Sequence, residues 1–314
     1  MTGTAEWIGK CAYNALIEEV NTTPKPGLVD LYSNGAHTDM DAETFRRSAE
    51  ALRPFFVKMA GEGLSFDGSA EELFMGLRSV GMDAEQAMYA ATDGVNTHKG
   101  AIFTFGIFCA AAGRCLKEQR ELTALGLLEM EQEMTVRVLS VELEKLRGNT
   151  GITGRETHGE RNLHRYGTAG CRGEAIEGYP GVFGIALPVL RAGLSSGRDW
   201  NRVKLQALLT LMAHTEDSNI LSRQNPAVLT AVQEEMIEFL RCGGAYRKDA
   251  IRLLEELDAD YSRRGISAGG CADLLAAAIF ILELTAGCRG GEDALELTTG
   301  CRGGEDALEL TTGC

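Results

Sequence analysis

The chain has 314 residues, 44% of them hydrophobic and 24% charged, which is typical of a soluble globular protein with room for a sizeable core. Its formal net charge of -14 argues against a general nucleic-acid surface, because phosphate backbones are bound by basic stripes that this chain supplies only locally. An anionic ligand must therefore bind in a local basic pocket.

The cysteines and the N-terminal residues indicate the cellular compartment in which the protein works. Nine cysteines show neither a CxxC pair nor a Cys/His metal spacing, and nothing at the N-terminus resembles a cleavable secretory signal. We therefore expect a cytoplasmic protein. The most apolar run, residues 101–112, is about half as long as a bilayer-spanning helix, so it predicts a buried helix and no membrane partner.

Helical spacing of apolar residues recurs along the chain. It predicts helices over residues 5–20, 41–59 and 121–147, while Ser69 and Asp83, each three residues before a Glu or Gln, predict two more helix starts. Further helices are predicted near residues 181–195, 199–214, 226–242, 245–264 and 271–286, and alternating β-branched runs are few. The pattern predicts an all-α fold, a single multi-helix globular domain over residues 1–286 with functional inter-helix loops.

The first polar loop, residues 22–41, reads as a rigid segment between two helices. Pro24 and Pro26 restrict the backbone, and the alternation of His37, Asp39 and Asp41 would place the three side chains on one side of an extended segment. Two carboxylates and an imidazole can share a cation or divide acid and base roles. The alternative is that Asp41 caps the next helix and Asp39 is a solvated turn residue.

A second polar segment lies directly before the apolar run. Asn96, Thr97, His98 and Lys99 precede the helix predicted at residue 101, where free backbone N–H groups and the helix dipole attract anions. These residue types favour a ligand contact. The alternative is a capped surface turn.

The third segment, residues 157–180, is locally basic and rich in glycine. It contains His158, Arg161 and Arg172 together with Glu160 and Glu174, and its planar guanidinium groups suit phosphates. A solvated helical face would also carry arginines, but it would not need so many glycines. The sequence therefore favours a functional segment.

Two further segments complete the set. His214, Glu216 and Asp217 form a turn after an apolar helix, although His214 could simply face the helix dipole. Gly269 and Gly270 belong to a small-residue loop before the last helix, which would let a phosphate or ribose approach the backbone. All five histidines lie in or beside these polar segments, which favours one composite site.

Together the stretches TTPKPGLVDLYSNGAHTDMD, GVNTHKGAIF, THGERNLHRYGTAGCRGEAIEGYP, HTEDSN and SAGGCADLLA resemble the triphosphoribosyl-dephospho-coenzyme A synthase family, over about residues 10–286. The resemblance implies a cytoplasmic all-α transferase that joins ATP to 3′-dephospho-coenzyme A and releases adenine. Its product is the precursor of the citrate lyase prosthetic group or, in a sister branch, that of malonate decarboxylase. An acyl-carrier-protein holo-synthase would receive the product, and a homo-oligomer stays open.

This reaction implies roles for the residues above. Displacement of adenine at a ribose carbon has oxocarbenium character, so it needs carboxylates as base and acid, and a cation for the triphosphate. The catalytic candidates are Asp39, Asp41, His37, Glu160 and Asp217. The candidate ligands of a Mg²⁺ cofactor are Asp39, Asp41, Glu160 and Asp217. The candidate substrate-binding residues are Lys25, Asn96, Thr97, His98, Lys99, His158, Arg161, Arg172, Glu174, Gly269 and Gly270.

Two other kinds of function use similar features. A Mg²⁺-dependent helical hydrolase of N-glycosidic or phosphate bonds would need the same residue types, and a non-enzymatic helical binding protein would need only the amphipathic helices. The C-terminal stretch, residues 287–314, contains RGGEDALELTTGC twice in succession. Two short copies do not form a solenoid, so we expect a mobile tail without a function.

Overall fold

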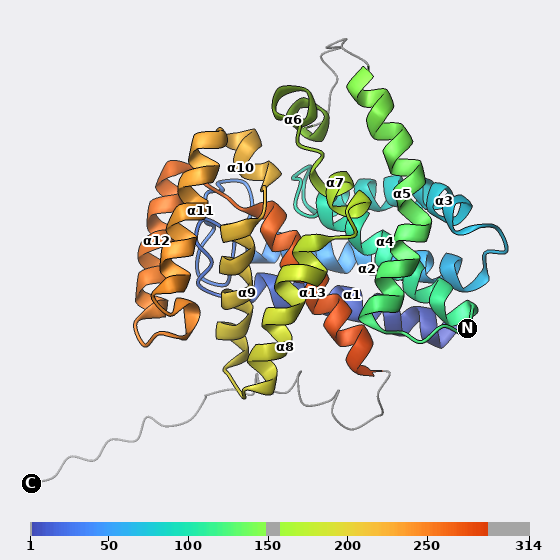
Figure 1. Ribbon diagram of the computed structural model, residues 1–314, viewed down its shortest axis with the longest axis horizontal. Coiled ribbons are helices and arrows are strands. Elements are labelled where there is room, and N and C mark those ends of the chain that lie inside the picture. The colour runs from blue at the N-terminus through green and yellow to red at the C-terminus, as the bar shows by residue number, and fades with distance from the viewer. Residues whose placement is uncertain (1, 149–157, 288–314) are drawn as a thin grey trace, which may run out of the picture.

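The computed structural model describes residues 2–148 and 158–287 (Figure 1). These two ranges contain thirteen α-helices, one π-helical turn and one 3₁₀ turn, and none of their residues lies in a strand. The predicted all-α fold is confirmed. The repeated tail lies outside the described residues, apart from Gly287 at the end of the last helix.

The N-terminal half consists of α1 (Thr2–Val20), α2 (Ala42–Ser65), α3 (Ala70–Ala91), α4 (Lys99–Lys117) and α5 (Ala124–Gly148). The helix start at Ser69 is confirmed, since its hydroxyl accepts a hydrogen bond from the Glu72 backbone and the Glu72 side chain accepts one in return. The start at Asp83 is wrong. That residue lies inside α3, because no chain-breaking residue interrupts the segment before it.

The C-terminal half contains the remaining helices, including three short ones that the sequence did not predict. They are α6 (His158–Tyr166), α7 (Gly170–Ile176) and α10 (Ser218–Arg223), which contain too few turns to show a periodic apolar face. The predicted longer helices are confirmed as α8 (Leu187–Ser195), preceded by a π-helical turn, α9 (Trp200–His214), α11 (Pro226–Arg241), α12 (Ala250–Arg264) and α13 (Gly269–Gly287).

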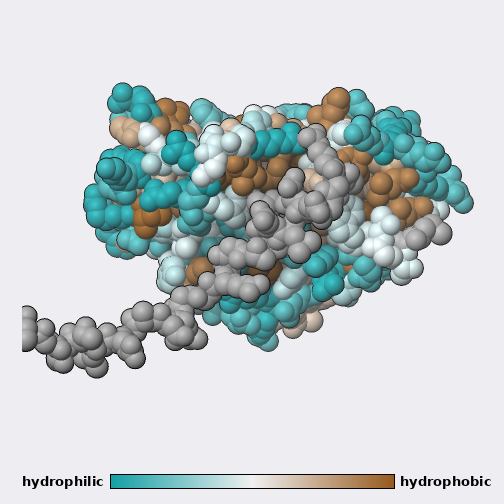
Figure 2. All heavy atoms as spheres, turned by 90° about the horizontal axis from the view of Figure 1, so that it is seen from below, coloured by the Kyte–Doolittle hydropathy of each residue, from teal (hydrophilic) through white to brown (hydrophobic). Residues whose placement is uncertain are grey.

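Helices α4 and α13 form the centre of the core. Both are long and apolar enough to cross a membrane by length and composition alone, but 72% and 67% of those stretches are buried inside the protein. The rings of Phe105 and Phe280 stack between them, with centroids 5.2 Å apart. In Figure 1, α13 runs through the middle of the molecule, and Figure 2 shows a largely hydrophilic outer face with scattered apolar patches. The buried helix predicted at residues 101–112 is confirmed.

Glycines allow α2 and α4 to pack backbone against backbone. A Cβ added at Gly113 would lie 2.3 Å from the Ala60 carbonyl oxygen, whereas one added at Gly76 on α3 would meet nothing within 4 Å. We expect Gly113→Ala to lower the free energy of unfolding by about 1–3 kcal/mol, because the two helices must move apart. Gly76→Ala, the matched control, should raise it by up to about 1 kcal/mol. Urea unfolding of both variants tests this, and equal stabilities would contradict it.

Candidate functional site

Three segments far apart in the sequence meet on one side of the helical core. They are the loop of residues 21–41, the segment of residues 215–225 that contains α10, and residues 265–270, which lead into the first turn of α13. His37 Nε2 lies 3.0 Å from Ser267 Oγ, and its Nδ1 lies 3.1 Å from Arg223 Nη2. Gln224 donates to the Arg264 carbonyl oxygen over 2.9 Å. We call this meeting place, together with the first turns of α4, α7 and α13, the polar junction.

Asp217 ties the starts of two helices together. Its Oδ1 accepts hydrogen bonds from the backbone N–H groups of Asn219 and Ile220, at 2.8 and 3.0 Å, and its Oδ2 accepts one from Cys271 at 2.8 Å. Burial raises the pKa of this carboxyl, and the backbone donors partly offset the rise. A Cβ at Gly270 would lie 3.0 Å from Oδ2, so the small residue allows this approach.

Asp273, two residues beyond Cys271, is a carboxylate that the sequence reasoning missed. A Cβ added at Gly100, in the first turn of α4, would lie only 2.2 Å from Asp273 Oδ2. Burial, and then the charges of Glu19 and Asp217, hold the pKa of Asp273 well above its usual value. The available signal was an acidic residue inside α13, a helix whose other residues are mostly apolar.

Two predicted substrate-binding side chains, Lys25 and His98, lie in the interior. Lys25 is 1% exposed and forms an ion pair with Glu19, whose backbone oxygen also accepts from Nζ at 2.9 Å. His98 Nδ1 lies 2.7 Å from Ser48 Oγ. Burial, and then the charge of Lys25, lower the pKa of His98 to about 3, so this imidazole is neutral at pH 7.

The rest of the segment before α4 is accessible. Asn96 and Lys99 are exposed, and Lys99 pairs with Glu85 of α3. Thr97 donates to Ser48 Oγ over 2.7 Å. The imidazole of His98 is thus enclosed, whereas the side chains of Asn96 and Lys99 are exposed to solvent.

The first loop is rigid for a reason that the sequence did not show. Asp30, which is buried, accepts four hydrogen bonds of 2.8–3.0 Å, from the backbones of Lys25, Tyr32 and Ser33 and from the hydroxyl of Thr23. This carboxylate therefore fixes the loop from its centre. Its signal in the sequence was only its place in the Pro/Gly-rich stretch.

The predicted grouping of His37, Asp39 and Asp41 stays a prediction, and its last member already serves in a helix cap. Asp41 is exposed, and its carboxylate caps α2 by accepting from the backbone and hydroxyl of Thr44, at 2.8 and 2.7 Å. Asp39 is closer to the imidazole, with Oδ1 3.9 Å from His37 Nδ1 and 60% of its side chain exposed. The alternative, that Asp41 caps the next helix, is confirmed. The first backbone N–H groups of α2 need hydrogen-bond acceptors, and the carboxylate of Asp41 supplies one.

The basic segment lies on α6 and α7. Arg161 is exposed and Arg172 half-buried, while Glu174 Oε2 accepts from the Gly181 backbone over 3.3 Å. Burial raises the pKa of Glu174. The side chains of His158 and Glu160 lie outside the described residues. Within the described ranges, no three His, Cys, Asp or Glu side chains lie close enough to hold a metal ion.

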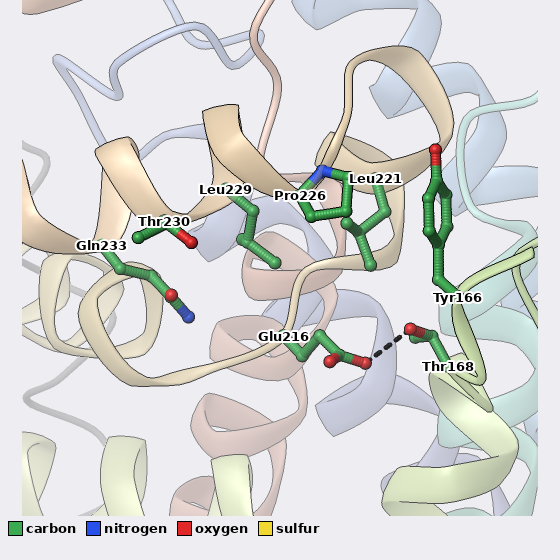
Figure 3. A pocket seen from close by; sticks show the side chains of 8 residues that line it. All are labelled: Tyr166, Thr168, Glu216, Leu221, Pro226, Leu229, Thr230 and Gln233. Atoms are coloured by element: carbon green, nitrogen blue, oxygen red, sulfur yellow. Dashed lines mark hydrogen bonds between the residues drawn. The ribbon is translucent and has the colours of Figure 1, made fainter.

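A cavity of about 300 Å³ opens beside the polar junction, between α11 and the segment after α6 (Figure 3). Thr168 donates to Glu216 Oε1 over 2.6 Å at its edge, and the enclosed hydroxyl of Tyr166 has no partner among the described residues. Among the described residues that line it, Glu216 alone is charged. The cavity is lined by Tyr166, Thr168, Glu216, Leu221, Pro226, Leu229, Thr230 and Gln233.

Comparisons with known proteins cover nearly all of the chain. Residues 5–290 match the family described as CitG: ATP:dephospho-CoA triphosphoribosyl transferase. The chain is 41% identical over 278 residues to the probable 2-(5''-triphosphoribosyl)-3'-dephosphocoenzyme-A synthase of Vibrio cholerae serotype O1 (strain M66-2), covering 88% of each protein. It is 38% identical over 285 residues to the 2-(5''-triphosphoribosyl)-3'-dephosphocoenzyme-A synthase of Klebsiella pneumoniae, covering 90% of this chain and 93% of that protein. No solved structure matches the chain.

Proposed function

The chain belongs to the family of ATP:dephospho-CoA triphosphoribosyl transferases, and on that premise we propose that the transfer takes place at the polar junction. The observation that supports this is the junction itself, where three of the five predicted polar segments meet through His37, Ser267 and Asp217. A reaction that must hold two large nucleotides and exclude water from a ribose carbon needs such a meeting of loops.

The acidic groups of the junction suit the chemistry. Asp217 and Glu174 both have a raised pKa caused first by burial, and the charges of both act on the pKa of Cys271. A carboxyl with a raised pKa exchanges its proton closer to neutral pH, and such a group is suited to protonate departing adenine. Glu174 accepts a single backbone hydrogen bond, so it is the better candidate for this acid. Asp217 instead has a structural role, because its carboxylate binds backbone N–H groups at the starts of α10 and α13.

Magnesium fits the site as a companion of the triphosphate. Mg²⁺ typically takes one or two protein carboxylates together with phosphates and waters, so a ready-made group of three protein ligands is not needed. Among the predicted ligands, Asp39 is exposed beside the junction, whereas the oxygens of Asp41 and Asp217 already serve as helix caps. When bound, the cation would neutralise phosphate charge, and Asp39 and Glu160 are the residues we propose to hold it.

The resemblance to the family also implies where the product goes. We propose that the product reaches the acyl carrier protein of citrate lyase, or of malonate decarboxylase, through a holo-synthase. We also propose that the enzyme works in the cytoplasm, which suits the six free cysteines among the described residues. An arrangement as a homo-oligomer stays open.

The decisive assay follows adenine release by purified protein with Mg²⁺. Adenine that forms only when ATP and 3′-dephospho-coenzyme A are both present supports the transfer. Adenine or phosphate from ATP alone would indicate the hydrolase alternative, and binding without turnover would indicate a binding protein.

The basic segment is expected to hold the triphosphate. Replacing Arg161 or Arg172 by alanine should cost about 1–3 kcal/mol of ATP-binding free energy, because each would remove a charge-assisted contact. Arg252→Ala on α12, which removes an exposed arginine paired with Glu256, is the matched control. Calorimetric titration with ATP measures the effect, and unchanged affinity in both test variants would contradict it.

A further inference from the structure

Asp273 differs from the other acidic side chains of the interior in having no partner. Glu19 pairs with Lys25, Asp217 accepts three backbone hydrogen bonds, and Glu174 accepts one. The carboxylate of Asp273 forms no hydrogen bond or ion pair with any residue in the described ranges. Among the described residues it is therefore the one interior carboxylate of the polar junction that has no partner.

The surroundings of Asp273 make an unpaired carboxylate energetically unfavourable. Burial and the like charges of Glu19 and Asp217 disfavour its ionised form, and an unpaired carboxylate is costly in such a place. The neighbouring helix nevertheless keeps room for it, since any Cβ at Gly100 would collide with Oδ2. Costly groups of this kind cluster at functional sites, where stability is given up for chemistry.

The carboxylate is also within reach of a ligand. Asp273 is half-buried, and neither of its oxygens is among the fully enclosed polar atoms that lack a partner. The charges of Arg172 and Asp273 both act on the pKa of the Cys171 thiol on α7, the first lowering it and the second raising it, so the two side chains belong to the same neighbourhood.

We infer that Asp273 is the catalytic base of the transfer, an assignment that rests on the proposed function and on the free carboxylate opposite Gly100. The proton of the attacking ribose hydroxyl of 3′-dephospho-coenzyme A moves to Asp273, and the hydroxyl oxygen forms a bond to C1 of the ribose of ATP. The C1–N bond to adenine breaks, and its electron pair leaves with adenine. Adenine takes up one proton, so the proton lost by the hydroxyl balances the one gained.

The neighbouring acids are less suited to this step. Three backbone donors bind Asp217 as a helix cap, and Glu19 is held in an ion pair with Lys25 in the interior. Asp39 and Asp41 lie at the exposed edge of the first loop. Position and availability thus single out Asp273.

The test compares Asp273→Asn with Glu131→Gln. Glu131 on α5 is a matched control, since it is fully buried and its Oε2 has no partner among the described residues. In steady-state adenine release with both substrates, D273N should lower kcat by about 10²–10⁴-fold while KM for each substrate changes less than about threefold. E131Q should keep wild-type turnover. Both variants should melt at or above the wild-type temperature, because each removes an unpaired carboxyl.

A second variant separates a missing base from a disturbed fold. Asp273→Ala leaves space for a small carboxylate, so added formate should restore part of the turnover, whereas it should not stimulate the wild type. D273N with a kcat within about threefold of wild type would overturn the assignment. So would a loss that appears only in KM, or a loss in D273A that formate does not relieve in a protein with a wild-type melting temperature. Wild-type adenine release that needs both substrates tests the proposed function separately.

Discussion

Replacing Lys25 by methionine is expected to lower the free energy of unfolding by about 3–5 kcal/mol, because it leaves the Glu19 carboxylate buried without its counter-charge. Both side chains are almost fully enclosed, with relative exposures of 1% and 7%. The loss also removes a donor to the Glu19 backbone oxygen. Urea unfolding at pH 7 and 25 °C measures the effect.

The controls distinguish an uncompensated charge from a lost contact. Glu19→Gln/Lys25→Met should recover a large part of the stability, because neither charge is then left alone. Arg252→Ala breaks an ion pair whose two side chains are each 60% exposed, so it should cost no more than about 0.5 kcal/mol. A cost below about 1 kcal/mol for K25M would contradict a buried pair. Wild-type turnover of the double variant would show that Lys25 acts only in the structure.

The helical core could be predicted because its signals are local. The apolar run that became α4, the last apolar segment that became α13 and the Ser69 cap depend on neighbouring residues alone. The false start at Asp83 shows the limit of such signals, since an acceptor three residues before a Gln also occurs inside a helix. The short helices α6, α7 and α10 are stabilised by tertiary contacts, such as Asn162 donating to the Ser218 carbonyl oxygen over 2.8 Å.

The candidate site was predictable as a set of segments but not as a set of contacts. The sequence singled out the loop with His37 and the turn with Asp217, and the structure joins them to the start of α13. It did not reveal Asp273 or Asp30, because an acidic residue gains its role from partners far away in the chain. Lys25 and His98 show the opposite case, since residue types that suit a ligand are here enclosed.

Glu131 should make the stability of the protein depend on pH. Its side chain is fully buried on α5, Oε1 accepts from Thr135 over 2.7 Å, and Oε2 has no partner among the described residues. Burial raises the pKa of Glu131 from 4.5 to about 8, and the hydrogen bond from Thr135 offsets only part of this rise. The nearby Tyr179 has its own pKa raised, first by burial and then by the charge of Glu131.

The raised pKa of Glu131 decides whether the stability of the protein rises or falls with pH. Below pH 4.5 the carboxyl is protonated in both the folded and the unfolded chain, whereas between pH 4.5 and about 8 only the unfolded chain releases the proton. Wild-type stability should therefore fall as the pH rises through this window, by roughly 3–5 kcal/mol relative to Glu131→Gln. Urea unfolding of both proteins at pH 5 and pH 9 measures the difference, with E131Q near wild type at the lower pH and clearly more stable at the higher one. Parallel pH profiles of the two proteins would show that Glu131 ionises in the folded state as freely as in the unfolded one, and that water reaches its second oxygen.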